Sequence, residues 1–117
     1  MTHELTGRIV VALGLDGVTD KAGLMDRCAR ALDLPDWFGR NWDALADSLA
    51  DHTLWPEAAV ERGLLIVVHG WRAYADARPG EWATAREVFA GAADRTASLT
   101  VALALGGSSE QRSDQAG

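Results

Sequence analysis

Three short apolar segments stand out along the chain, separated by stretches with helical periodicity. They are residues 8–15 (RIVVALGL), 64–68 (LLIVV) and 99–105 (LTVALAL). The first is nearly all apolar and rich in β-branched residues, which is typical of a strand buried on both faces of a parallel sheet. Short strands separated by helices favour parallel pairing through right-handed crossovers. The pattern therefore predicts an α/β fold, with a small three-stranded parallel sheet packed with three to four helices.

A first helix is predicted between the first two strands. Its inward face carries residues at four-residue steps: Leu24, Cys28 and Leu32. Thr19 or Asp20 is expected to cap its N-terminus. Pro35 is expected to end it, because the residue before a proline is pushed away from helical geometry.

The spacing of apolar residues along the chain also predicts two further helices. Asn41 is a good cap for a second helix that runs to about Ala50 or Asp51. Its inward residues are Trp42, Leu45 and Leu49. A third helix is predicted over 81–94, and the stretch 69–80 before it is interpreted as a loop. The inward residues of the third helix are Trp82, Ala85, Val88, Phe89 and Ala92.

The chain length suits a single domain. Of the 117 residues, we assign 1–106 to this domain. Residues 107–117 are polar and rich in Gly, Ser and Gln, so we predict a disordered tail there. The one cysteine, Cys28, excludes an internal disulfide and is interpreted as a core residue.

Features of a secreted or membrane protein are not found in the sequence. The N-terminal residues lack the basic-then-apolar pattern of a signal peptide. No apolar run approaches the roughly 18 residues that a membrane span needs. We therefore expect a cytoplasmic protein without a membrane partner.

The negative charge is concentrated in one segment. The net charge is -6, and seven of the 17 acids but one of the 11 bases lie between Asp33 and Glu61. The rest of the chain is balanced, with ten acids and ten bases. A patch of this kind repels nucleic acid and attracts a basic partner. We expect no direct nucleic-acid binding.

The second helix contributes much of this acidity. Asp43, Asp47 and Asp51 fall at four-residue steps and would share one helix face. Like charges at this spacing destabilise a helix by roughly 0.2–0.5 kcal/mol per pair. Asp43 offsets the helix dipole in the first turn, but no Lys or Arg lies within a helical turn of the other two. A solvated face and a binding surface for a basic partner both agree with this pattern.

The loop before this helix contains Trp37, Phe38 and Gly39. Two adjacent aromatics in a tight loop cannot easily both point inward, so we expect one of them to be exposed. An exposed aromatic beside acids is typical of an interface hot spot. Carboxylates in place of phosphates and a ring in place of a base would also mimic single-stranded RNA.

These residues form part of a longer motif. Residues 34–45 read LPDWFGRNWDAL. This resembles the signature of the barstar family: a leucine–proline pair, two aromatics, glycine, any residue, asparagine, then a helix with aspartate-alanine-leucine. Weaker matches continue in the second strand, in Trp71-Arg72, in Val88-Phe89 and in the last strand. The resemblance covers most of residues 21–105.

The resemblance implies a barstar-like fold and a function. The implied function is inhibition of a secreted guanyl-specific microbial ribonuclease by a protein inside the cell, in a 1:1 complex. The loop and the second helix would cover the enzyme's active site. By position, Trp37 matches the aromatic that contacts the catalytic site, and Phe38 is its neighbour. Asp43 and Asp47 match the helix acids that meet the enzyme's phosphate-binding arginines.

Gly39 and Asn41 match loop positions that hold the turn. Together with Asp51, which the acidic pattern adds, the expected partner-binding residues are Trp37, Phe38, Gly39, Asn41, Asp43, Asp47 and Asp51.

The chain also departs from the family pattern. Ala46 replaces an aromatic in the middle of the helix, and Asp51 and His52 align with a glycine and a tryptophan. Gly91 aligns with a glutamate that contacts the enzyme in the family's best-known member. We infer that the target is a different ribonuclease, with its basic residues arranged differently.

Two other interpretations stay open. A Mg²⁺-dependent enzyme would use Asp43 and Asp47 as ligands, with Asp16 after the first strand. The glycines form no phosphate-binding loop and no nucleophile–base pair is found, so we expect no enzyme, cofactor or metal. A non-inhibitory interaction module of the same fold would bind another basic protein through the same surface. The free protein is expected to be a monomer.

Overall fold

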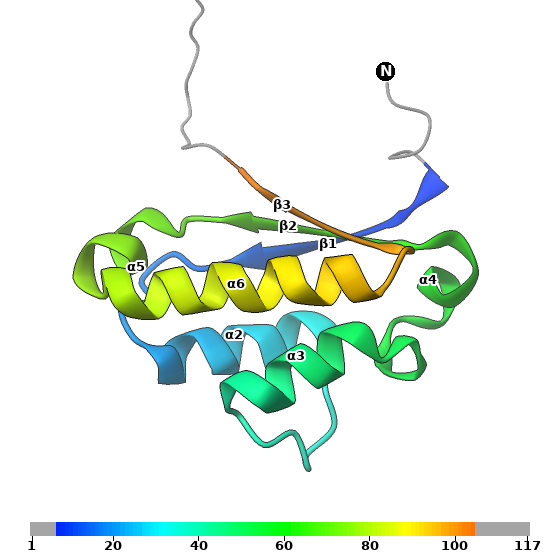
Figure 1. Cartoon of the computed structure of the whole chain (residues 1–117), viewed down its shortest axis with the longest axis horizontal. Helices are drawn as coiled ribbons and strands as arrows, with labels where there is room; N and C mark the ends of the chain where they lie inside the picture. Colours follow the sequence, from blue (N-terminus) through cyan, green and yellow to red (C-terminus); the bar gives the residue numbers. More distant parts are fainter. Residues whose placement is uncertain (1–6, 105–117) are drawn as a thin grey trace, which may run out of the picture.

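A three-stranded parallel sheet forms one side of the molecule (Figure 1). The computed structural model describes residues 7–104. Its strands β1 (Ile9–Gly14), β2 (Leu64–His69) and β3 (Leu99–Leu103) lie in the order β1-β2-β3. This confirms the predicted parallel sheet. The predicted tail at 107–117 lies outside the described residues.

The two faces of the sheet differ. The register aligns Val11, Ile66 and Val101 in one row, on the face that packs against the helices. On the other face, Val10 is 55% exposed and Ala12 is also exposed. The prediction that the first strand is buried on both faces is therefore wrong. The reason is that the long helices all lie on the same side of the sheet (Figure 1).

Helix α2 (Lys21–Leu32) packs on β1. Asp20 is its cap, and the Oδ1 atom of Asp20 accepts a hydrogen bond from the Gly23 N–H at 2.9 Å. Its buried face consists of Leu24, Met25, Cys28 and Leu32. The helix ends because Asp33 adopts a left-handed conformation (φ 51°), two residues before Pro35. The predicted helix is confirmed, with this difference at its C-terminus.

Helix α3 (Trp42–Ala50) packs on the last long helix and confirms the second predicted helix. A 3₁₀ turn, η1 (His52–Leu54), and a short helix, α4 (Glu57–Arg62), follow it. Neither segment is predicted from the sequence, because each is too short to show a helical period. Trp55 holds this region to α3, since its Nε1 donates to the carbonyl of Leu49 at 3.0 Å.

The stretch interpreted as a loop contains a helix. Helix α5 (Arg72–Ala77) lies within it, and helix α6 (Pro79–Arg95) begins two residues before the predicted start. Proline suits the first turn of a helix because its missing N–H has no helical partner there. Aromatic packing holds α5 and α6 together: Trp82 stacks on Trp71 with centroids 5.3 Å apart and contacts buried Tyr74 edge-on. These tertiary contacts stabilise a six-residue helix that has little intrinsic stability.

The core lies between the sheet and the helices. The inward residues predicted for α2, α3 and α6 are buried or pack against the core. Cys28 is fully buried, and desolvation raises the pKa of its thiol to about 12. None of the helices in the described part of the chain has the length and apolar character to cross a membrane.

Candidate functional site

The loop before α3 separates its two aromatic side chains. The Phe38 N–H donates to the Pro35 carbonyl at 2.9 Å, which closes a tight turn around Trp37. Phe38 points into the core and is 6% exposed, whereas Trp37 is 71% exposed. This confirms the expectation that one of the two is exposed. Phe38 thus anchors the loop, and Trp37 presents its ring to solvent.

The end of the loop is shaped by three consecutive residues. A Cβ at Gly39 would lie 3.3 Å from the Cβ of Ala44, so glycine fits the close approach to α3. Arg40 has a left-handed backbone (φ 56°) that few residues other than glycine adopt. Asn41 caps α3, since its Oδ1 accepts a hydrogen bond from the Ala44 N–H at 2.8 Å. These features confirm the predicted cap and set the entry angle of the helix.

The acids of α3 form no ion pair with any residue that the structure describes. Asp43 and Asp47 are both exposed and stand one helical turn apart, opposite the buried Leu45 and Leu49. Among residues 7–104, none of the acids between Asp33 and Glu61 forms an ion pair within 4.0 Å. Within the described part of the chain, the acidic segment seen in the sequence therefore has no direct ion-pair partner.

Three cations reach α3 or its loop, but they contact other groups. Arg95 of α6 donates to the backbone carbonyl of Ala46 at 3.2 Å. Arg40 pairs with Asp26 of α2 at 3.9 Å. Lys21 lies over the Trp42 ring, 5.8 Å from its centroid. The Arg40 and Arg95 contacts could not be predicted from local sequence patterns, because both join residues on different elements.

Asp51 has a structural role that its spacing from Asp43 and Asp47 does not predict. Helix α3 ends at Ala50, so Asp51 does not continue the helical stack of Asp43 and Asp47. Its Oδ1 accepts hydrogen bonds from the N–H and hydroxyl of Thr53 and caps η1. These bonds lower the pKa of the Asp51 carboxyl. The Asp-x-Thr spacing was the signal that could have indicated this cap.

The positions where the chain departs from the family pattern lie close together. Ala46 is in the middle of α3, and Gly91 is in α6, the helix that packs on α3. Arg95 lies one helical turn beyond Gly91 and contacts Ala46. This side of α3 therefore carries small side chains and a guanidinium group.

The described part of the chain was also examined for clusters of metal ligands. Among residues 7–104, no group of three or more His, Cys, Asp or Glu side chains could hold a metal ion. Asp16, the third residue of the magnesium interpretation, lies at the carboxyl end of β1, where it faces His69 at 3.8 Å.

We call the group formed by Trp37, Asp43, Asp47 and Asp51 the loop–α3 surface. It combines an exposed indole with the carboxylates of Asp43 and Asp47, for which no hydrogen bond is found among the described residues, and with Asp51, whose Oδ1 is bound by Thr53. The loop lies at the end of the molecule farthest from the sheet (Figure 1). The surface can therefore contact a large, positively charged partner without interference from the sheet.

Comparison with known proteins agrees with this architecture. The family model described as "Barstar (barnase inhibitor)" matches residues 9–106. A search of curated proteins finds no match. The match covers all three strands and the whole loop–α3 surface, and the family is one of inhibitors rather than enzymes. This chain therefore belongs to the barstar family.

Proposed function

We propose that this protein inhibits a secreted guanyl-specific microbial ribonuclease inside the cell, one enzyme per chain. The loop–α3 surface covers the active site. Trp37 occupies the catalytic site, and Asp43 and Asp47 bind the cations that otherwise hold RNA phosphates. Phe38, Gly39 and Asn41 hold the loop in shape, and Asp51 lies at the edge of the contact.

The lack of ion-pair partners for the acids of α3 and its loop is the observation that carries this proposal. Within residues 7–104, these acids form no ion pair within 4.0 Å, whereas Asp16, Asp26 and Glu81 elsewhere in the chain do. A ribonuclease active site offers cations in a compact group, because it binds a polyanion. When the partner binds, attraction between its cations and the α3 carboxylates offsets the repulsion between these carboxylates. Long-range attraction between such surfaces also speeds association.

The rigid loop also favours tight binding. Phe38 is buried and Asn41 is engaged in the cap, so Trp37 projects from a turn that is held at both ends. A preorganised loop loses less conformational entropy on binding. Trp37 therefore has the exposure and the support expected of an anchor residue.

A second candidate is a module that binds a different basic protein and does not inhibit a ribonuclease. Ala46 and Gly91 favour it, because this side of α3 lacks the aromatic and the glutamate that the family pattern has at these two positions. It uses the same loop–α3 surface. The experiment below distinguishes the two.

The proposal is tested by titrating a panel of secreted guanyl-specific ribonucleases with the purified protein. We expect the activity of at least one enzyme to fall linearly to zero at one chain per enzyme, with association slowing as salt rises. Full activity of every enzyme at excess protein would overturn the inhibitor function. Binding without loss of activity would favour the second candidate.

A Trp37→Ala variant tests whether Trp37 is the anchor residue of the interface. Hot-spot aromatics contribute about 2–4 kcal/mol when removed, so inhibition should weaken by roughly 30- to 700-fold. The matched control is Val10→Ala, which removes another exposed apolar side chain on the uncovered face of the sheet. Equal effects of the two variants would contradict the role of Trp37.

A further inference from the structure

Arg95 of helix α6 lies beside the acids of α3. The Nη2 atom of Arg95 donates to the Ala46 carbonyl at 3.2 Å. Asp47 follows Ala46 in the chain and Asp43 lies three residues before it, so both are neighbours of Ala46 on the helix surface. Among the described residues, Arg95 nevertheless forms no ion pair within 4.0 Å. The acidic face of α3 is therefore bordered by a cation that is not paired with its carboxylates.

Most hydrogen-bond donors of Arg95 remain available to a partner. A guanidinium group has five N–H donors, and the bond to Ala46 is the one side-chain hydrogen bond of Arg95 found within residues 7–104. The space around the exposed guanidinium is open. A Cβ at Gly91, one helical turn before Arg95, would meet nothing within 4 Å beyond its chain neighbours and its own helical backbone. A partner that contacts the α3 acids can therefore also reach Arg95.

The charge of Arg95 is unfavourable toward a uniformly basic partner. It repels the same cations that Asp43 and Asp47 attract, and like charges brought together in an interface oppose binding. A carboxylate on the partner reverses this effect, because a guanidinium group can bind a carboxylate through two parallel hydrogen bonds. A ribonuclease active site is suited to offer one, since Asp and Glu are among the side chains that transfer protons in such sites.

We propose that Arg95 determines which enzyme is recognised, by pairing with a carboxylate that the partner presents beside the cations bound by Asp43 and Asp47. The partner is then a basic enzyme with an acid at the edge of its cation cluster, and a basic surface alone is not sufficient. This inference rests on the proposed inhibition, and it names the charge pattern that the target carries.

The Arg95→Glu variant tests the proposal through the sign of its effect. Without a carboxylate opposite Arg95, the more acidic surface attracts a basic enzyme more strongly, so binding would stay unchanged or become tighter. With that carboxylate, two like charges face each other, and the dissociation constant should rise about ten-fold or more. Binding kinetics with the enzyme that the panel shows to be inhibited, at low and high salt, measure this.

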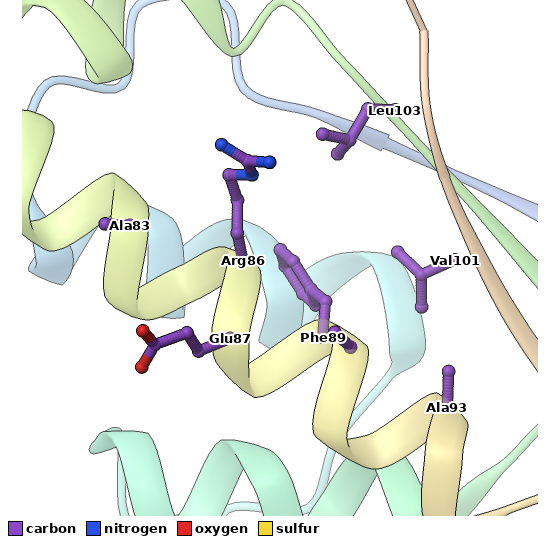
Figure 2. A pocket seen from close by; sticks show the side chains of 8 residues that line it. Ala83, Arg86, Glu87, Phe89, Ala93, Val101 and Leu103 are labelled. Atoms are coloured by element: carbon purple, nitrogen blue, oxygen red, sulfur yellow. The ribbon is translucent and has the colours of Figure 1, made fainter.

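Arg86→Glu is the matched control, because it makes the same charge change on the same helix. Arg86 points toward β3 and lines a groove between α6 and β3 together with Val101 and Leu103 (Figure 2). This control should bind the enzyme as tightly as the unaltered protein or slightly more tightly. A cation in the last turn also stabilises α6 itself, so urea denaturation of both variants is measured alongside binding.

Charge reversal on the enzyme separates pairing from a structural role of Arg95. Each exposed Asp or Glu that borders the active site of the inhibited enzyme is changed to Lys in turn. One of these enzyme variants should bind Arg95→Glu about ten-fold more tightly than it binds the unaltered protein, because the pair is restored with reversed signs. A loss of helix stability does not produce such a rescue.

Two results would overturn the role of Arg95 and leave the inhibition in place. One is unchanged or tighter binding of Arg95→Glu to the inhibited enzyme. The other is the failure of every enzyme variant to restore binding. Full activity of the whole ribonuclease panel would instead overturn the inhibition and this inference together.

Discussion

Helices α2 and α3 have similar buried faces, but they differ in whether their acids form ion pairs. Each begins at a side-chain cap, Asp20 for α2 and Asn41 for α3, and each packs a row of apolar residues inward. On α2, Asp26 pairs with Arg30 at 3.2 Å and with Arg40 at 3.9 Å. On α3, Asp43 and Asp47 have no such partner among the described residues.

The comparison separates acids that stabilise the folded chain through ion pairs from acids that do not. The ion pairs of Asp26 join neighbouring turns of α2 and link α2 to the loop before α3. Asp43 and Asp47 repel each other and add nothing to the stability of α3 that the structure shows, apart from the favourable position of Asp43 near the helix N-terminus. A surface that lowers stability in this way is typical of a binding site.

The largest expected effect is on inhibition by the Asp47→Ala variant. Losing one carboxylate of a hydrogen-bonded charge pair buried in an interface costs about 2–5 kcal/mol in general, so inhibition should weaken roughly 30- to 4,000-fold. An inhibition assay against the target enzyme measures this. The Asp26→Ala control removes an acid from α2 and should leave inhibition nearly unchanged. Equal losses would place the contact outside the loop–α3 surface.

The two caps give the next largest effect. Asn41→Ala and Asp20→Ala should each lower the free energy of unfolding by about 0.5–2 kcal/mol, because each leaves a helix N–H without its partner. Urea denaturation measures both. Only Asn41→Ala should also weaken inhibition, since Asn41 shapes the loop that carries Trp37. Weakened inhibition in both variants would show that the loss follows stability alone.

Neutralising the acids should change stability in opposite directions on the two helices. Asp47→Asn removes a like-charge pair and should raise the free energy of unfolding by about 0.2–0.5 kcal/mol at low salt. Asp26→Asn removes an attraction and should lower it by a similar amount. Denaturation at low and high salt measures the difference, which should shrink as salt rises. The same sign for both variants would contradict the comparison.

The smallest expected effect concerns acid stability at the end of α3. Hydrogen bonds from Thr53 lower the pKa of Asp51 below its ordinary value of 3.8. A lowered pKa in the folded state contributes stability that is present above pH 3.8 and is lost as pH falls through the folded pKa. Asp51→Asn should therefore flatten the stability curve on the acid side, as thermal denaturation between pH 5 and pH 2, roughly, would show. An unchanged acid limb would contradict this role of the Thr53 bonds.

Local patterns in the sequence determined much of the fold. The three apolar segments, the inward faces of the long helices and the Asn41 cap were all predicted and are found. They depend on residues within one or two turns of each other, so a single stretch of sequence contains the whole signal. The short helices α4 and α5 were missed because packing of Trp55, Trp71 and Tyr74 stabilises them, and that packing joins distant residues.

For the loop–α3 surface, the sequence by itself determined the chemistry: an acid excess, two adjacent aromatics and a family motif. Only the tertiary structure decided which ring is exposed, since the fold packs Phe38 into the core and leaves Trp37 on the outside of the turn. It also decided that the acids stay unpaired, because Arg40 and Arg95 reach groups other than Asp43 and Asp47. Charge content is a property of composition, whereas compensation of charge depends on distances that exist only once the chain has folded.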